Sequence, residues 1–130
     1  MLNGSCHCGT LRWYYAAAPE AATACNCTIC RRYGALWIYG FDGKEVTTEG
    51  DSAAYIRGNH IAFHFCPNCG CACFMQGLRK EPDGSRRMAV NLRMAGDPDA
   101  VQSIPLRGFD GLNRFEPLPD EGRCVADIWA

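Results

Sequence analysis

The sequence predicts a mainly β fold of about six to eight short strands in twisted antiparallel sheets, with little helix. Turn-forming Gly, Asp, Asn and Pro recur between short stretches that are rich in aromatic and β-branched residues. Apart from the Ala-rich residues 16–24, where a helix is left open, only one segment has a helical pattern, and it is a single turn long. With 130 residues, 48% of them hydrophobic and 21% charged, the chain has the size and composition of one globular domain, residues 1–130.

The first half of the chain has alternating patterns typical of strands. In residues 11–15, apolar side chains alternate with Arg12 and Tyr14. The Ala-rich residues 16–24 contain Pro19, so a loop is as well supported there as a helix. A single helical turn is expected at residues 31–34, ended by Gly34. Further strands are expected at residues 35–41, 45–48 and 52–57, and Trp37 and Tyr39 are assigned to the core.

The second half contains three clear strand patterns. They cover residues 61–65, residues 71–76 on the return side of a Cys-rich turn, and residues 88–92. Residues 96–119 carry scattered Pro and Gly and are expected to be mostly irregular. A last short strand is expected at residues 125–129.

Ten cysteines are the most unusual feature of the composition. The first residues lack the basic and apolar regions of a secretory signal, so we expect a cytoplasmic protein whose thiols stay reduced. Several thiols recur as Cys-x-Cys, and in a strand these Cα atoms lie ~6.6–6.8 Å apart. That separation is at the far edge of the disulfide range, so the cysteines favour metal binding.

Three of the thiols, Cys25, Cys27 and Cys30, fall within six residues. Alternate residues of an extended chain face the same side, and a turn after Cys27 would bring Cys30 to the same point. Three converging thiolates suit tetrahedral Zn²⁺ with one open position, which is the pattern of a catalytic site. The alternative is a structural site whose fourth ligand comes from elsewhere in the chain.

A second set combines Cys66 and Cys69 with Cys6 and Cys8. The Cys-Pro-Asn-Cys-Gly sequence at residues 66–70 is typical of a zinc knuckle, in which Gly supplies a positive φ. Cys6 and Cys8 form another close pair beside glycine, so the four thiols predict a closed structural zinc site. The opposite grouping, with Cys66 and Cys69 serving the trio, would overfill that site. Outside both sets remain Cys71, Cys73 and Cys124, of which Cys71 or Cys73 could add a ligand.

Charge and hydropathy exclude several classes of partner. The net charge is −1 and no dense Lys or Arg run is present, which argues against nucleic-acid binding. No segment approaches the ~20 consecutive apolar residues of a membrane span. The sequence leaves a homo-oligomer open.

With these motifs identified, the chain resembles the glutathione-dependent formaldehyde-activating enzyme family, which also includes centromere protein V. The resemblance lies in residues 4–9 (Gly-Ser-Cys-His-Cys-Gly), 25–32 (Cys-Asn-Cys-Thr-Ile-Cys-Arg-Arg) and 65–70 (Phe-Cys-Pro-Asn-Cys-Gly). It implies a zinc-bearing β-tent fold with two Zn²⁺ per chain. The structural ion would lie at Cys6, Cys8, Cys66 and Cys69, and the catalytic-type ion at Cys25, Cys27 and Cys30. The family usually has small polar or apolar residues after the knuckle, where this chain has Cys71, Ala72 and Cys73.

The resemblance also implies carbon–sulfur lyase chemistry, in which glutathione and formaldehyde condense to S-hydroxymethylglutathione or the reverse. A free thiol has a pKa of about 8.5, and metal binding would deprotonate it at neutral pH. Arg31 and Arg32 could bind glutathione carboxylates, and His7 and His64 could carry protons. Two alternatives are a non-enzymatic zinc-binding interaction module, and metal buffering or redox sensing through the surplus thiols.

Overall fold

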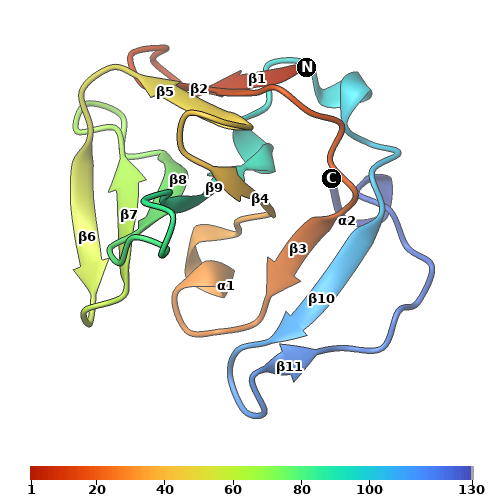
Figure 1. Cartoon of the computed structure of the whole chain (residues 1–130). Coiled ribbons are helices and arrows are strands. Elements are labelled where there is room, and N and C mark those ends of the chain that lie inside the picture. The colour runs from red at the N-terminus through yellow and green to blue at the C-terminus, as the bar shows by residue number, and fades with distance from the viewer. Residues whose placement is uncertain (130) are drawn as a thin grey trace.

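The computed structural model describes residues 1–129 as eleven short strands in two sheets, with short helices between some of them (Figure 1). The strands are β1 (Leu2–Ser5), β2 (Arg12–Tyr15), β3 (Ala22–Cys25), β4 (Trp37–Phe41), β5 (Val46–Glu49), β6 (Ala53–Arg57), β7 (Ile61–Phe65), β8 (Ala72–Gly77), β9 (Arg87–Asn91), β10 (Leu106–Asp110) and β11 (Glu116–Pro117). The helices are α1 (Cys30–Tyr33), α2 (Ala126–Trp129) and the 3₁₀ turns η1 (Leu92–Met94) and η2 (Pro98–Ala100). The mainly β fold class is confirmed.

One sheet has three strands in the order β1-β2-β5, and the other has eight in the order β11-β10-β3-β4-β9-β8-β7-β6. Most neighbours are antiparallel, as expected. The exception is the pair β3 and β10, which runs parallel with Cys25 opposite Phe109. This pairing joins the region of the cysteine trio to a strand more than eighty residues later in the chain.

The two faces of the large sheet carry different clusters of apolar side chains. Ile38 and Val90, which lie opposite each other on β4 and β9, belong to a large core that also contains residues of the small sheet. We call this side the inner face. Trp37 on the same strand belongs instead to a smaller cluster with Phe63 and Ala89, on what we call the outer face. The small sheet therefore packs against the inner face of the large sheet and not against its outer face.

Gly40 allows the small sheet to pack tightly against β4. A Cβ atom at Gly40 would lie 3.1 Å from Val46 Cγ2 and 3.3 Å from a ring carbon of Tyr15. The Tyr15 hydroxyl also donates a 2.7 Å hydrogen bond to the carbonyl oxygen of Tyr39. A larger side chain at this position would push the sheets apart.

Several expected elements agree with the structure. Strand β7 covers residues 61–65 as predicted, and β4 and β9 fall within one or two residues of their expected bounds. Helix α1 is the expected single turn. Gly34 follows it in the left-handed conformation, with φ 64°, and its N–H donates to the carbonyl oxygen of Cys30.

Other expectations were wrong, wholly or in part. The C-terminal segment expected as a strand contains helix α2, where the N–H of Ile128 donates to the carbonyl oxygen of Val125. Residues 96–119 are mostly irregular as expected, but they also contain η2, β10 and β11, which were not expected. Of the segment 16–24, residues 16–21 form the expected loop, whereas residues 22–24 belong to β3. Strand β1 was not expected. Tyr39 is 37% exposed and so is not a core residue, unlike Trp37, which is 1% exposed.

No helix within residues 1–129 has both the length and the apolar character needed to cross a membrane.

Candidate metal centres

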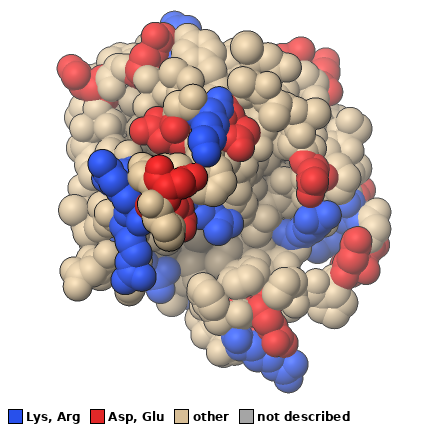
Figure 2. Space-filling model, viewed as in Figure 1, with Lys and Arg blue, Asp and Glu red and all other residues tan. Residues whose placement is uncertain are grey.

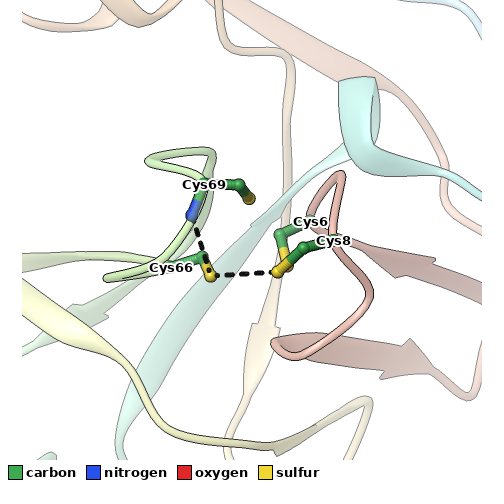
Figure 3. A group of neighbouring side chains, drawn as sticks. All are labelled: Cys6, Cys8, Cys66 and Cys69. Atoms are coloured by element: carbon green, nitrogen blue, oxygen red, sulfur yellow. Dashed lines mark hydrogen bonds between the residues drawn. The ribbon is translucent and has the colours of Figure 1, made fainter.

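Four cysteines from two distant segments form the first cluster. The Sγ atoms of Cys6, Cys8, Cys66 and Cys69 all lie within 4.8 Å of one another (Figure 3). Cys8 Sγ is 3.6 Å from Cys6 Sγ and 3.5 Å from Cys66 Sγ. Four sulfurs placed tetrahedrally around Zn²⁺ at ~2.3 Å are ~3.8 Å apart, so the donor set and its spacing fit this metal.

The local backbone supports these thiols with hydrogen bonds. The N–H of Leu11 donates to Cys6 Sγ at 3.3 Å, and the N–H of Cys69 donates to Cys66 Sγ at 3.5 Å. Gly70 closes the knuckle with φ 81°, as its sequence position predicted. Cys6 and Cys66 are 2% and 0% exposed and belong to the core of the inner face. The cluster therefore ties the loop after β1 to the turn after β7 at the edge of the core.

The second cluster is the trio at the end of β3. The Sγ atoms of Cys25, Cys27 and Cys30 lie within 4.8 Å of one another, and no fourth Cys, His, Asp or Glu within residues 1–129 joins them. Cys25 ends the strand, and Cys30 begins α1. The N–H of Cys30 donates to Cys27 Sγ at 3.4 Å, which is the turn that the spacing predicted.

Hydrogen bonds and burial act unequally on the trio thiols. Burial raises the pKa of Cys30 to about 12, although the indole N–H of Trp37 donates to its sulfur at 3.3 Å. Burial also tends to raise the pKa of Cys27. Hydrogen bonds to this thiol, of which the one from the N–H of Cys30 is the strongest, outweigh burial and lower the pKa to about 7. Holding all three as thiolates at neutral pH therefore requires a compensating cation, and a divalent metal ion supplies one.

Arg57 is a contact of the trio that the sequence did not predict. Its guanidinium, at the end of β6, donates to Cys27 Sγ at 3.7 Å. Strand β6 is an edge strand of the large sheet, and Arg57 pairs with Ile61 of β7. A permanent positive charge thus stands beside a cluster that carries negative charge when its thiols ionise.

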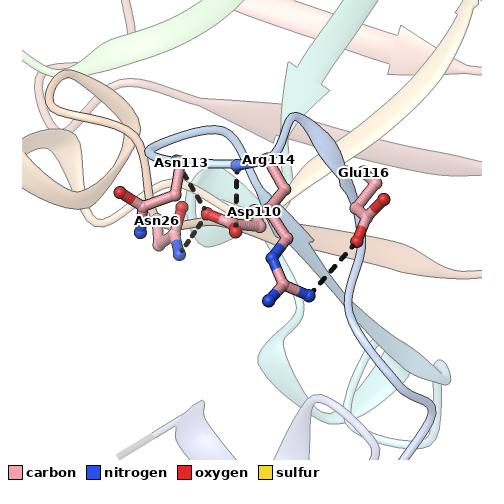
Figure 4. Close-up of polar contacts among 5 residues, drawn as sticks. All are labelled: Asn26, Asp110, Asn113, Arg114 and Glu116. Atoms are coloured by element: carbon pink, nitrogen blue, oxygen red, sulfur yellow. Dashed lines mark hydrogen bonds and ion pairs between the residues drawn. The ribbon is translucent and has the colours of Figure 1, made fainter.

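The loop between β10 and β11, residues 111–115, covers the trio. A Cβ atom at Gly111 would lie 2.6 Å from Cys25 Sγ and 3.0 Å from Cys27 Cβ, so only glycine fits there. Asp110, which is 7% exposed, accepts hydrogen bonds from Asn26 Nδ2 and from the N–H groups of Asn113 and Arg114 (Figure 4). These bonds, led by that of Asn113, hold the pKa of the Asp110 carboxyl below its usual range. The loop is therefore fastened to the residue between Cys25 and Cys27.

Beside this loop, the outer face is hollowed into a cleft of about 490 Å³. Its lining includes Tyr39, Ile61, Met75, Arg87, Phe109 and Phe115. The cleft adjoins the trio, because Phe109 lies opposite Cys25 on paired strands. Ile61 and Met75 also pack against the cluster that contains Cys27 and Cys30. Figure 2 shows both acidic and basic side chains on the surface in this view, with one short strip of basic side chains at the left.

The other candidate residues lie in varied positions. His64 stacks on Phe74 at 4.6 Å, and its Nδ1 lies 2.8 Å from Ser52 Oγ, so its ring packs on the opposite side of β7 from Phe63. Arg32 donates to the carbonyl oxygen of Thr28 at 2.7 Å, whereas Arg31 is exposed. The structure does not bring His64 to the trio.

The remaining predicted residues lie elsewhere. His7 is exposed between two members of the four-cysteine cluster. Cys71, Cys73 and Cys124 are free thiols outside both clusters, and Cys73 is fully buried.

Sequence reasoning missed Arg57, Asp110 and Gly111. Arg57 reads as an exposed strand residue, and its contact with Cys27 spans thirty residues. Asp110 and Gly111 belong to a strand and loop that the scattered Pro and Gly concealed. Asn26 was a weak signal that another segment contacts the trio. An amide side chain both donates and accepts hydrogen bonds, so an Asn between two thiols can bind a second segment of the chain.

These features define a mainly β protein with a four-cysteine cluster at its core and a three-cysteine cluster beside an open cleft. Residues 1–103 match the model of the glutathione-dependent formaldehyde-activating enzyme family, so the chain belongs to that family. The resemblance seen in the sequence motifs is thus confirmed.

One solved structure illustrates how the fold is shared. A crystal structure of a Rhodobacter sphaeroides protein is similar to this chain with a TM-score of 0.60 and 20% sequence identity. The match covers 80% of this chain and 98% of that one, and at this identity it shows the fold alone. No curated protein matches the chain.

Proposed function

We propose that this protein is a zinc-dependent carbon–sulfur lyase that forms and breaks an adduct between a thiol and an aldehyde. The family suggests glutathione and formaldehyde as the reactants, with S-hydroxymethylglutathione as the adduct. The single observation that carries the proposal is the trio of Cys25, Cys27 and Cys30, which lacks a fourth protein ligand within residues 1–129 and adjoins a cleft. Each chain would hold two Zn²⁺, a structural one in the four-cysteine cluster and a catalytic-type one in the trio.

Zinc held by the trio would supply an open coordination position at which a thiol loses its proton at neutral pH. Three thiolates and one divalent ion carry a net charge of −1, which favours delivery and release of a thiolate over strong activation of the aldehyde. Arg57 beside Cys27 offsets that charge and is placed to bind a carboxylate of the thiol substrate. Trp37 donates to Cys30 Sγ and so holds one ligand in place.

The reaction needs no further reagent. A bond forms between the thiol sulfur and the aldehyde carbon, the carbonyl π bond breaks, and the thiol proton ends on the oxygen. The reverse reaction returns the proton to sulfur. A reducing compartment such as the cytoplasm keeps both the substrate thiol and the seven ligand thiols available, and we propose that location for the protein.

The test is exchange of formaldehyde with glutathione, measured by NMR with excess zinc. We expect the parent to accelerate exchange and Cys27→Ser to abolish the acceleration while remaining folded. Cys124→Ser is the matched control, since Cys124 lies outside both clusters. Equal rates for parent and Cys27→Ser would remove the chemistry from the trio. No acceleration by the parent would favour a zinc-binding interaction module instead.

A further inference from the structure

The cleft on the outer face is larger and more apolar than formaldehyde requires. Formaldehyde has one carbon, whereas the cleft measures about 490 Å³, which is within the range of sites for much larger ligands. Ile61, Met75, Phe109 and Phe115 supply apolar side chains to its lining. Within the described lining Arg87 is the one charged residue, and its guanidinium lies 4.9 Å from the centre of the Tyr39 ring.

The charged groups that suit a polar thiol lie near the trio and are not part of the cleft lining. Arg57 contacts Cys27 from the end of β6, and Arg31 is exposed on α1, next to Cys30. A thiol such as glutathione can place its carboxylates against these guanidinium groups. Its sulfur then lies at the trio, and the group attached to the sulfur points toward the apolar cleft.

Phe115 stands out in the lining because of its backbone. It has φ 55° and is the one residue other than glycine with positive φ in the described chain, a conformation that is costly for a bulky side chain. The residue is 76% exposed, and its ring packs edge-on against Phe109, with ring centres 5.0 Å apart. The backbone thus holds a large apolar ring at the edge of the cleft, where it gains little from burial in the core.

Phe115 also lies outside the part of the chain that the family model matches. The family model matches residues 1–103, whereas β10, β11 and the loop between them follow residue 103. The same loop covers the trio at Gly111 and is fastened by Asp110. One segment outside the matched region therefore closes the metal centre and completes the cleft.

From the cleft, its position at the trio and the placement of Phe115, we infer that the aldehyde partner carries an apolar body, such as an aryl or medium-length alkyl group. We further infer that Phe115 determines this specificity. The inference rests on the proposed function, since it names the aldehyde class for the same reaction. The balance of bonds is unchanged: sulfur adds to the carbonyl carbon, and the thiol proton moves to the oxygen. Arg87 at the cleft suits a polar substituent on the apolar group.

Binding of two stable thioethers to the zinc-loaded protein tests this by calorimetry. S-benzylglutathione imitates an adduct with an aryl aldehyde, and S-methylglutathione imitates the formaldehyde adduct. We expect the parent to bind the benzyl compound about tenfold more tightly or better, because the ring buries apolar surface. Phe115→Gly, which fits the positive φ, should remove most of this preference and leave binding of the methyl compound within about twofold.

Leu112→Ala is the matched control, because Leu112 is 50% exposed in the same loop and is not part of the cleft lining. It should keep the preference of the parent. Phe115→Asn is a second variant that tolerates the same backbone conformation, and it guards against misfolding of the glycine variant. Equal binding of the two thioethers by the parent would overturn the inference, as would an equal loss of preference in Leu112→Ala and Phe115→Gly.

The formaldehyde exchange assay separates the two proposals. Formaldehyde exchange by a parent without benzyl preference overturns the inference and leaves the proposed reaction standing. A benzyl preference that depends on Phe115, with exchange of neither formaldehyde nor an aryl aldehyde, supports the assignment of the cleft to an apolar group and overturns the proposed reaction.

Discussion

The two cysteine clusters use the same donor atom in different surroundings. Cys6 and Cys66 are buried in the core between the sheets, and their cluster joins segments that lie fifty-eight residues apart. The trio comes from six consecutive residues on the outer face and lies between a cleft and a loop. Four ligands that anchor two distant segments at the edge of the core would make a structural tie, whereas three ligands beside a cleft would leave a position for a substrate.

The comparison indicates that the location of a cysteine cluster, more than the type of its ligands, separates a cluster that supports folding from one that supports a reaction. Removing a ligand from the first cluster should unfold the chain, because a zinc ion bound there would contribute folding free energy. Removing a ligand from the trio should disturb only the smaller apolar cluster of the outer face, which contains Cys27 and Cys30. Three further predictions test this separation.

The largest expected effect is on stability. Cys66→Ser should lower the melting temperature by about 10 °C or more, since a loss of ~3 kcal/mol shifts the midpoint of a chain of this size by roughly 4 °C per kcal/mol. Cys27→Ser should shift it far less. Thermal melts followed by circular dichroism measure both, and elemental analysis should find two zinc ions in the parent and one in Cys27→Ser. A Cys66→Ser variant that melts like the parent would show that its cluster is not structural.

The next effect is on metal affinity at the trio alone. Gly111→Ala places a methyl group against Cys25 Sγ, so the loop must move or the thiol must turn. We expect the weaker zinc to bind about tenfold less tightly, as for a change in the surroundings of a ligand, with the tighter zinc unchanged. Competition with a chelator separates the two affinities.

Gly108→Ala is the control for that experiment, since its added methyl group would meet the flexible side chain of Leu118. A similar loss of zinc in both variants would mean that β10 as a whole, and not the contact at Gly111, supports the trio.

The last effect, on the exchange rate alone, concerns Arg57. Arg57→Gln removes the charge beside Cys27 and should slow formaldehyde exchange by about tenfold, which corresponds to ~1.4 kcal/mol for a hydrogen bond to a charged group. Melting should not change, because Arg57 is exposed. Arg79→Gln, at another exposed arginine, should have no effect on the rate. Unchanged exchange in Arg57→Gln would show that this contact is incidental.

Spacing along the chain predicted the grouping of the cysteines well. Tetrahedral metal geometry restricts which thiols can share an ion, and the Cys-x-x-Cys turn with its following Gly70 is a local pattern. The structure groups the seven thiols as the sequence predicted, while their binding of zinc stays a prediction. Strands in which side chains alternate strongly between the two faces, such as β7, were also predictable, because that pattern lies within the strand itself.

Features that depend on distant partners were not predictable. Strand β10 contains Arg107 and Gly108, which have no strong strand propensity, and it exists because it pairs with β3. Tyr39 has the aromatic character of a core residue, yet it faces a cleft that only the later loop completes. The segment at 125–129 has strand-like residues, but local hydrogen bonds close it into a helical turn.

The late position of β10 also has a consequence during synthesis. Synthesis adds ~5–20 residues per second, so Cys66 is added roughly 3–12 s after Cys8. The trio is complete in sequence at Cys30, but its cover arrives only with Gly111, some eighty residues later. For that interval the nascent chain presents three uncovered thiols, so the order of synthesis would allow a zinc ion to enter the trio before the loop closes over it.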